Sequence, residues 1–194
     1  MPKVVDHNER RTRIAEALMR VAGERGLEAV SLRHVAAEAG VTSGMVQHYF
    51  RTKDEMMRFA IEVVRERGEA RLAEATARLG PDPTPRALLR TIVAELLPVD
   101  EPRRVDGRVT LAFFAYTAVR PEVAKALRAD TATMVGGVAE QIRAGGPRPG
   151  VDPELAAVAL LALMEGLGIY LLGGHYTAEM ALAALDAHLD TIFA

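Results

Sequence analysis

The chain has 194 residues, 49% of them apolar, and it contains no cysteine, which excludes disulfides, thiolate metal sites and cysteine nucleophiles. Ala, Leu, Arg, Glu and Met together outnumber the β-branched and aromatic residues, so the composition favours helix and little or no sheet. The net charge of −2 is uneven, with +3 on residues 1–53 and −5 on the remainder. A basic end on an acidic body favours a polyanionic partner at that end.

The beginning of the chain, Met1 to Arg13, is charged and lacks the apolar core of a secretory signal. We therefore expect the protein to stay in the cytoplasm. The segment Leu155 to Gly173 is nearly long enough to span a bilayer, but Glu165 lies near its middle and its flanks lack anchoring Lys or Arg. We interpret it as a buried helix of a soluble protein.

The first part of the chain predicts four short amphipathic helices with clear capping signals. Asp6 with Glu9 opens a run that ends at Gly26, Ser31 opens one that ends at Gly40, and Thr42 opens the third. Thr52 with Glu55 forms a second capping box for a longer helix towards Gly80. The expected shared core is Ile14, Leu18, Val21, Leu32, Val35, Ala36, Val41, Val46 and Phe50.

Beyond Gly80, proline marks the helix starts, at Thr84-Pro85, Glu101-Pro102, Arg120-Pro121 and Asp152-Pro153. Thr177 is the expected cap of the last helix. The pattern predicts an all-α protein of about nine helices: an N-terminal arm over 1–8, a small helical domain over 9–56 and a larger one over 57–194. A continuous helix is expected to join the two domains.

The segment from Ser31 to Phe50 has the pattern of a helix-turn-helix. Gly40 permits the left-handed backbone that ends the first helix, Val41 fills the core of the pair, and Thr42 caps the second helix. Helices of this kind read DNA in the major groove, so the motif predicts a DNA-binding protein.

The run from Gly26-Leu27-Glu28 to Met56 resembles the TetR family of transcriptional regulators, and the match covers about residues 9–60. Val5-Asp6-His7, Arg10-Arg11 and Met164-Glu165-Gly166-Leu167 resemble the betaine-regulator-like branch of that family. The resemblance implies an N-terminal three-helix DNA-binding domain with a helix-turn-helix and a larger helical domain for effector binding and dimerisation.

The resemblance also implies a set of DNA contacts. Arg33, Ser43, Gly44, Gln47 and His48 would face the major groove, where Gln can bond adenine and Arg can bond guanine. Thr42, Tyr49 and Lys53 would contact phosphates, and a cation in the first turn of a helix such as Lys53 is explained by such a partner. Gln47 departs from the family, in which an aromatic residue is usual. Arg10, Arg11 and Arg13 are either a solvated face or an arm that contacts DNA.

For the C-terminal body the resemblance implies a homodimer held by a four-helix bundle, two helices from each subunit. The predicted interface comprises Glu165, Gly166, Gly168, Ala184, Leu185, His188 and Ile192. Glu165 is either an interface residue hydrogen-bonded to polar neighbours or a charge in an effector pocket. The predicted contacts of a small apolar or amphipathic effector are Phe113, Phe114, Tyr116, Met134, Met164 and Tyr170.

No catalytic or phosphate-loop motif occurs, and the five His residues are scattered without metal-ligand spacing. We therefore expect no enzyme, no cofactor and no metal. The predicted function is a sequence-specific DNA-binding transcriptional regulator, a repressor released from a palindromic operator by a small effector. The alternative is a DNA-binding regulator without a small ligand, which acts constitutively or through a protein partner.

Overall fold

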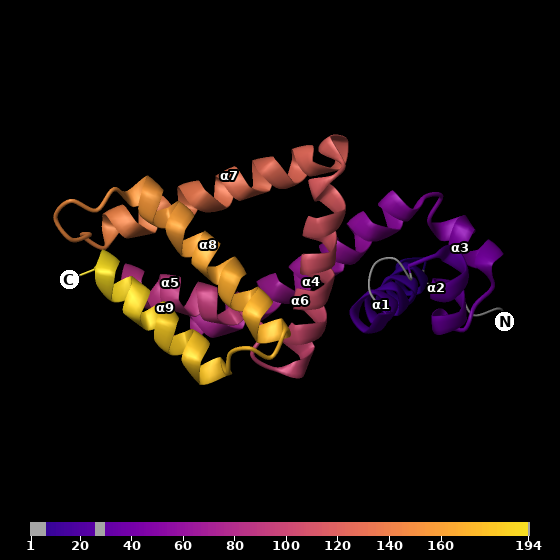
Figure 1. The fold of residues 1–194 in the computed structure, drawn as a ribbon, viewed down its shortest axis with the longest axis horizontal. Coiled ribbons are helices and arrows are strands. Elements are labelled where there is room, and N and C mark those ends of the chain that lie inside the picture. Colours follow the sequence, from indigo (N-terminus) through magenta and orange to yellow (C-terminus); the bar gives the residue numbers. More distant parts are fainter. Residues whose placement is uncertain (1–6, 26–29, 194) are drawn as a thin grey trace. The chain divides into compact units, whose positions relative to one another are not determined.

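The computed structural model describes residues 7–25 and 30–193, and this part of the chain forms nine α-helices (Figure 1). Their bounds are α1 (His7–Arg25), α2 (Leu32–Ala39), α3 (Ser43–Tyr49), α4 (Lys53–Ala77), α5 (Pro85–Leu96), α6 (Glu101–Ala118), α7 (Pro121–Ala144), α8 (Pro153–Leu172) and α9 (Ala178–Ile192). A single bridge between Pro147 and Phe193 is the only β pairing among these residues. The all-α prediction is confirmed.

Most of the predicted helix starts are capped as expected. The side chains of Ser31, Thr42, Thr84, Asp152 and Thr177 each accept a hydrogen bond from the backbone N–H three residues later. The cap of α6 differs from the prediction, because Asp100 accepts from the N–H of Arg103 at 3.0 Å. Asp6, the predicted cap of the first helix, and Gly26, its predicted end, lie outside the described residues.

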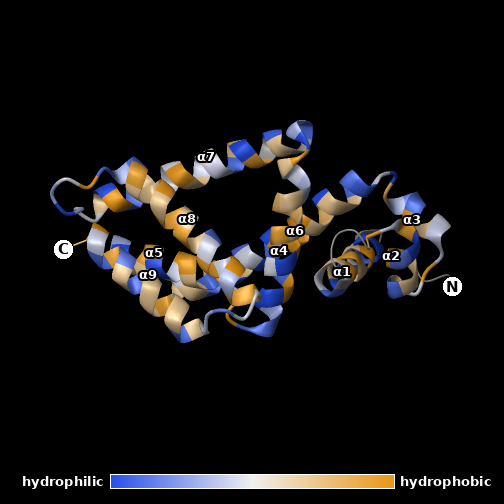
Figure 2. Cartoon of the chain, in the orientation of Figure 1, coloured by the Kyte–Doolittle hydropathy of each residue, from blue (hydrophilic) through white to orange (hydrophobic). Residues whose placement is uncertain are grey.

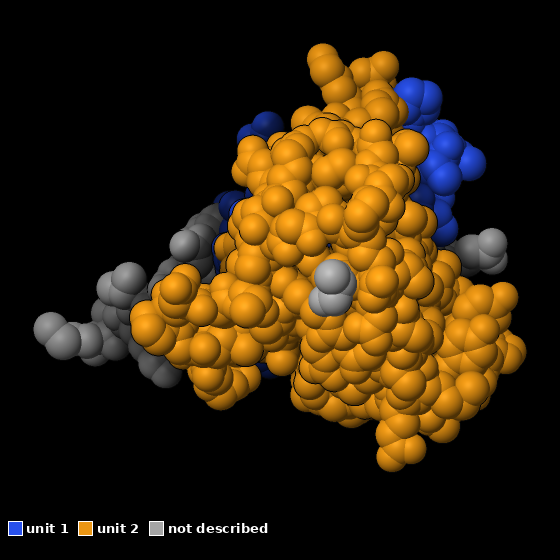
Figure 3. All heavy atoms as spheres, turned by 90° about the vertical axis from the view of Figure 1, so that its left-hand side faces the viewer, with its two compact units in different colours: residues 1–67, 105–121 blue, residues 68–104, 122–194 orange. Residues whose placement is uncertain are grey.

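The chain divides into two compact units (Figure 3). Unit 1 comprises residues 1–67 and 105–121, and unit 2 comprises residues 68–104 and 122–194. The continuous helix expected to join the domains is α4, which runs unbroken through residue 56. The division falls later than that residue, after 67, and residues 105–121, which include most of α6, belong to the first unit. Sequence order alone does not reveal that residues 105–121, far along the chain, belong to the first unit.

The core of unit 1 contains most of the residues expected from helical periodicity. Those that are buried are Ile14, Leu18, Val21, Val35, Ala36, Val46 and Phe50. Leu32 and Val41 are only half-buried. Met56, Met57 and Ala60 of α4 and Phe113 of α6 are also buried in this unit, so the helix-turn-helix rests on a core that α4 and α6 help to build.

The core of unit 2 lies between α5, α7, α8 and α9. Helix α8 is apolar along most of its length (Figure 2), and its composition and length would suit a membrane span. Its side towards the core is Ala157, Leu160, Met164, Leu167 and Leu171, all buried. The expected burial of this helix holds for that side in the single chain, whereas Leu155, Val158, Ile169 and Tyr170 on its other side are exposed.

Candidate nucleic-acid interface

A tight turn sets the geometry of the pair α2 and α3. Gly40 has φ +66°, in the left-handed region that glycine adopts without steric cost, and it ends α2. The N–H of Val41 then bonds the carbonyl of Ala36 at 2.9 Å, and Thr42 caps α3 through the N–H of Met45 at 3.2 Å. The predicted helix-turn-helix is therefore present, with its glycine and its cap in the expected roles.

Helix α3 presents a polar side to solvent. Ser43, Gly44, Gln47 and His48 are all exposed, whereas Val46 is buried against the unit's core. The two pairs Ser43 with Gln47 and Gly44 with His48 are spaced by four residues, so each pair lies on one side of the helix. Gln47 and Ser43 offer hydrogen-bond donors and acceptors that base edges can use.

Gly44 is not required by the packing of the chain. A Cβ placed on it would meet only the Oγ1 of Thr42 at 3.9 Å, an ordinary contact, and its φ is not in the left-handed region. Neither backbone strain nor a close neighbour in the protein explains a glycine in this helix. The absence of a side chain leaves the exposed surface of α3 open to close approach by another molecule.

The remaining predicted DNA contacts surround this surface within unit 1. Arg33 on α2 and Thr42 are exposed, and Lys53 is the first residue of α4. The Thr42 oxygen accepts the capping bond, so its hydroxyl hydrogen remains able to donate. Tyr49 is half-buried, with its ring edge-on to His48 at 5.3 Å between centroids.

The three arginines of α1 have different environments. The guanidinium of Arg11 lies 4.6 Å from the ring centre of Phe59 and 5.2 Å from that of Phe50, a stacked position that ties α1 to the start of α4. A nitrogen of Arg10 lies 3.4 Å from the sulfur of Met45. Arg13 is exposed. Arg11 thus packs on aromatic rings of its own unit, a role that neither predicted alternative, a solvated face or an arm that contacts DNA, included.

The predicted interface residues of unit 2 do not share one surface. Leu185 and Ile192 are buried in the unit's own core, so their prediction as interface residues is wrong: the helical stripe that suggested them is the inward side of α9. Gly168 also turns inward, since a Cβ on it would lie 3.7 Å from Pro98. Gly166 differs, because a Cβ there would meet nothing within 4 Å.

The other predicted interface residues are more accessible. Ala184 is exposed, and Glu165 and His188 are half-buried. Burial raises the pKa of Glu165 above its usual range. Exposed apolar residues that the prediction omitted complete this side of α8 and α9: Leu155, Val158, Ile169 and Met180. Apart from Glu154 and Glu165, α8 is apolar, so periodicity gives little indication of which of its sides is exposed.

The predicted effector contacts divide between the two units. Phe113, Phe114 and Tyr116 belong to unit 1, and the hydroxyl of Tyr116 donates to the carboxylate of Asp54. In unit 2, Met164 lies in the core while Met134 and Tyr170 are exposed. Tyr170 stacks on Tyr176 at 4.9 Å between ring centres. The three predicted effector contacts in unit 2, Met134, Met164 and Tyr170, therefore do not line one pocket by themselves.

A helix-turn-helix with a polar exposed recognition helix, built into an all-helical chain with a separate apolar body, defines the class of DNA-binding regulators. Among the described residues no group of three or more His, Asp or Glu side chains could hold a metal ion. The comparisons with known proteins place the chain within this class more narrowly.

Two family models match the chain. Residues 14–58 match the model of bacterial regulatory proteins of the tetR family, and residues 85–194 match that of the C-terminal part of BetI-type transcriptional repressors. The chain therefore belongs to the TetR family of transcriptional regulators, with a C-terminal domain of the BetI type. Both parts of the predicted resemblance are confirmed.

Individual relatives cover nearly the whole chain. The HTH-type transcriptional regulator PksA of Bacillus subtilis is 33% identical over 171 residues, 88% of this chain and 82% of the relative. The crystal structure of a transcriptional regulator from Rhodococcus sp. Rha1 is 36% identical, with a TM-score of 0.82 over 94% of this chain and 95% of that one. A putative regulator from Saccharomonospora viridis in complex with choline shares the fold, at 24% identity and a TM-score of 0.80 over 95% of this chain and 98% of that one.

Proposed function

We propose that this regulator is a repressor that binds a palindromic operator as a homodimer and is released by a small organic effector. The observation that carries the DNA-binding part is the exposed polar side of α3, with Ser43, Gly44, Gln47 and His48 on a helix whose other side is packed in the core. Arg33 and Gln47 read bases, and Thr42, Tyr49 and Lys53 contact phosphates.

The exposed side of α8 supports the homodimer. Leu155, Val158, Ile169 and Tyr170 are exposed apolar residues on this side of α8, and the half-buried Glu165 is the charged residue that lies beside them. Such a surface is costly to leave in water, and a second copy of the same helix is the partner that two-fold symmetry supplies. Gly166 lies on this side of α8 and lets the two backbones approach closely.

Glu165 supports an effector that carries a positive charge. Its half-buried carboxylate has a raised pKa because burial is not offset by a partner charge. An organic cation would remove that penalty, and the choline bound to the structural neighbour belongs to this chemical class. The rival role of Glu165, a hydrogen-bonded residue of the dimer interface, predicts instead that the variant Glu165→Gln changes the dimer and not the response to the effector.

DNA binding is tested by fluorescence anisotropy with the palindrome upstream of the encoding gene and with random DNA of equal length. Arg33→Ala and Gln47→Ala each lower the preference for the palindrome, at about 1–3 kcal/mol for each lost base contact. Lys53→Ala weakens binding to both DNAs and flattens the salt dependence by about one unit. Equal palindrome affinity for the parent and all three variants would contradict the assignment.

Effector control is tested by titrating choline, and its neutral carbon analogue as control, with and without operator DNA. Because linkage is reciprocal, a compound that releases the protein from DNA must bind more weakly when DNA is present, by the same factor. A 100-fold factor corresponds to about 2.7 kcal/mol. Equal affinity in both conditions means that the compound is not the inducer, and the failure of a wider set of organic cations would favour the regulator without a small ligand.

Cytoplasmic location is part of the same proposal, since a regulator of this family must reach chromosomal DNA. Helix α8 meets the length and composition of a membrane span, but its inward side belongs to the core of unit 2. Extraction of the native protein from membranes only by detergent would contradict the proposal.

A further inference from the structure

Residues 105–121, which comprise most of α6 and the turn after it, belong to unit 1 together with the helix-turn-helix. At one end of this segment, Arg67 of α4 forms an ion pair with the buried carboxylate of Asp106 at 3.6 Å. The same guanidinium bonds Glu16 of α1 at 2.7 Å. One arginine therefore connects three helices and fixes the segment against the DNA-binding helices.

At the other end, the hydroxyl of Tyr116 donates a hydrogen bond to the carboxylate of Asp54. Tyr116 is buried, and both its burial and the nearby carboxylate raise the pKa of its hydroxyl, which keeps it a proton donor at neutral pH. The guanidinium of Arg120 lies 3.9 Å from the centre of the Tyr116 ring and donates to the Tyr116 carbonyl at 3.2 Å. The tyrosine is thus held from both sides.

Asp54 occupies a sensitive position, in the first turn of α4 directly after Lys53. This turn is anchored on its own side by Thr52, whose hydroxyl oxygen accepts the N–H of Glu55 at 3.1 Å, and by Glu55, whose carboxylate accepts the N–H of Arg51 at 2.9 Å. Tyr116 supplies a further anchor from α6, 62 positions away in the chain.

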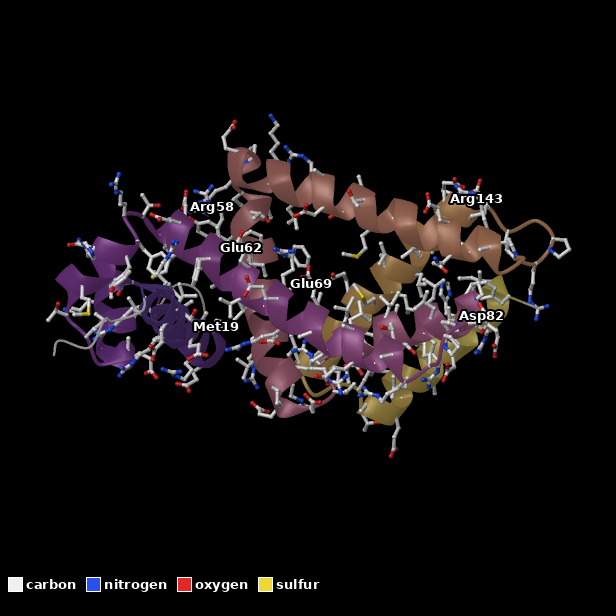
Figure 4. The ribbon with its side chains drawn as sticks, turned by 180° about the vertical axis from the view of Figure 1, so that it is seen from behind. Met19, Arg58, Glu62, Glu69, Asp82 and Arg143 are labelled. Atoms are coloured by element: carbon white, nitrogen blue, oxygen red, sulfur yellow. The ribbon has the colours of Figure 1, made fainter. Side chains whose placement is uncertain are left out.

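The charged residues near Asp54 make the hydrogen bond that Tyr116 donates to it relevant to DNA binding. Asp54 directly follows Lys53 in the chain, so the position in which Tyr116 holds its carboxylate affects the potential that a phosphate meets. Arg58 lies one turn further along α4 (Figure 4), and its guanidinium donates to the Asp54 carbonyl at 3.4 Å. The positive charges of Arg58 and Arg120 lower the pKa of the Tyr116 hydroxyl, whereas the negative charge of Asp54 raises it.

We propose that Tyr116 is a positioning residue for operator binding: its hydrogen bond to Asp54 holds the first turn of α4, and with it Lys53, in the orientation that meets the DNA backbone. Tyr116 acts through Lys53 and does not itself touch DNA. This inference rests on the proposed operator binding through Lys53.

The test is a double-mutant cycle on the full-length protein with Tyr116→Phe, Lys53→Ala and the double variant. Operator affinity is measured from 50 to 200 mM salt, active protein is counted by stoichiometric titration, and thermal unfolding checks the fold. Tyr176→Phe in unit 2 is the matched control, because it removes the hydroxyl of a tyrosine outside the DNA-binding unit. A second variant, Asp54→Asn, keeps an acceptor for the Tyr116 hydroxyl.

We expect Tyr116→Phe to weaken operator binding about tenfold, the equivalent of about 1.4 kcal/mol, and to flatten the salt dependence as Lys53→Ala does. In the Lys53→Ala background the same change costs less than about twofold. Asp54→Asn keeps affinity at or above that of the parent. Full additivity, or no loss with Tyr116→Phe, would overturn the inference. Loss of affinity with Lys53→Ala but not with Tyr116→Phe would leave the proposed function intact, whereas the absence of operator binding by the parent would refute that function itself.

Discussion

The exposed sides of α3 and α8 differ in chemistry although each belongs to a helix whose opposite side is packed in a core. Helix α3 exposes Gln47 and His48, whereas α8 exposes Val158 and Ile169. Polar groups on a rigid helix are stable in water and can exchange water for base edges. Apolar side chains gain stability only when another surface covers them. This difference supports the proposal that two different partners complete the molecule, DNA on α3 and a second copy on α8.

The largest effect is expected from placing a charge on the apolar side of α8. In Ile169→Asp, dimerisation would bury an unpaired carboxylate, so we expect a monomer and a loss of operator affinity of at least about 100-fold. Leu96→Asp on α5 is the matched control, because Leu96 is 41% exposed and Ile169 48% in the single chain. Sedimentation velocity and anisotropy check both variants. A dimeric Ile169→Asp with parental affinity would show that this surface has another role.

A smaller effect is expected at Gly44. Its Cβ position is open within the protein, so Gly44→Ala should be as stable as the parent or more stable, by up to about 1 kcal/mol. The added methyl group instead meets the DNA, and we expect about tenfold weaker operator binding, the equivalent of about 1.4 kcal/mol. Gly136→Ala on α7, which is equally open, should be stabilised without losing affinity. Unchanged affinity for Gly44→Ala would place the DNA elsewhere than on α3.

Glu165 provides a test by pH. Because burial raises its pKa in the folded chain above the unfolded value, the folded protein bears a penalty when the carboxylate is ionised. The penalty is full above the folded-state pKa and vanishes as the pH falls below the unfolded-state pKa. Glu165→Gln should therefore raise the melting temperature near pH 8 and have little effect near pH 4. Glu140→Gln at an exposed position of α7 is the control. A stabilisation that is independent of pH would exclude ionisation of Glu165 as its cause.

The smallest effect is expected for the ion pair between α5 and α9. Arg90 bonds both oxygens of Asp186, at 2.6 and 3.0 Å, and these bonds lower the pKa of Asp186. A lowered pKa stabilises the folded chain above the unfolded-state pKa, and this contribution is lost as the pH falls through the folded-state pKa. Because the pair is well exposed to water, Asp186→Asn should cost only about 0.2–1 kcal/mol at neutral pH and less in acid. A cost above about 2 kcal/mol would show that the pair is more than a surface contact.

The contrast between the two regions also explains what could be predicted from the sequence. The caps and the turn around Gly40 depend on residues within a few positions of each other, so local chemistry was sufficient to predict them. Helical periodicity placed Val46 of α3 in the core, and the family resemblance supplied the exposed residues Ser43, Gly44, Gln47 and His48. The family resemblance added the roles of Arg33 and Lys53, which local chemistry alone leaves open.

The failures have equally specific causes. Helix α8 is apolar apart from Glu154 and Glu165, so its sequence gave little indication of which side faces solvent, and Gly168, which lies against Pro98, was assigned to the exposed side. Leu185 and Ile192 lie on a real stripe of α9, but that stripe packs into the chain's own core. The contact of Tyr116 with Asp54 joins positions 62 apart, and no spacing rule relates such positions.

The central claim is that a second copy covers α8 while DNA covers α3. It is tested most directly by sedimentation equilibrium of the full-length protein, alone and with a duplex carrying one palindrome. With a chain mass of 21.0 kDa, we predict twice that mass for the free protein and the same two copies on each duplex. A free protein that stays at 21.0 kDa at micromolar concentration, and binds the palindrome as a single copy with full affinity, would contradict the account.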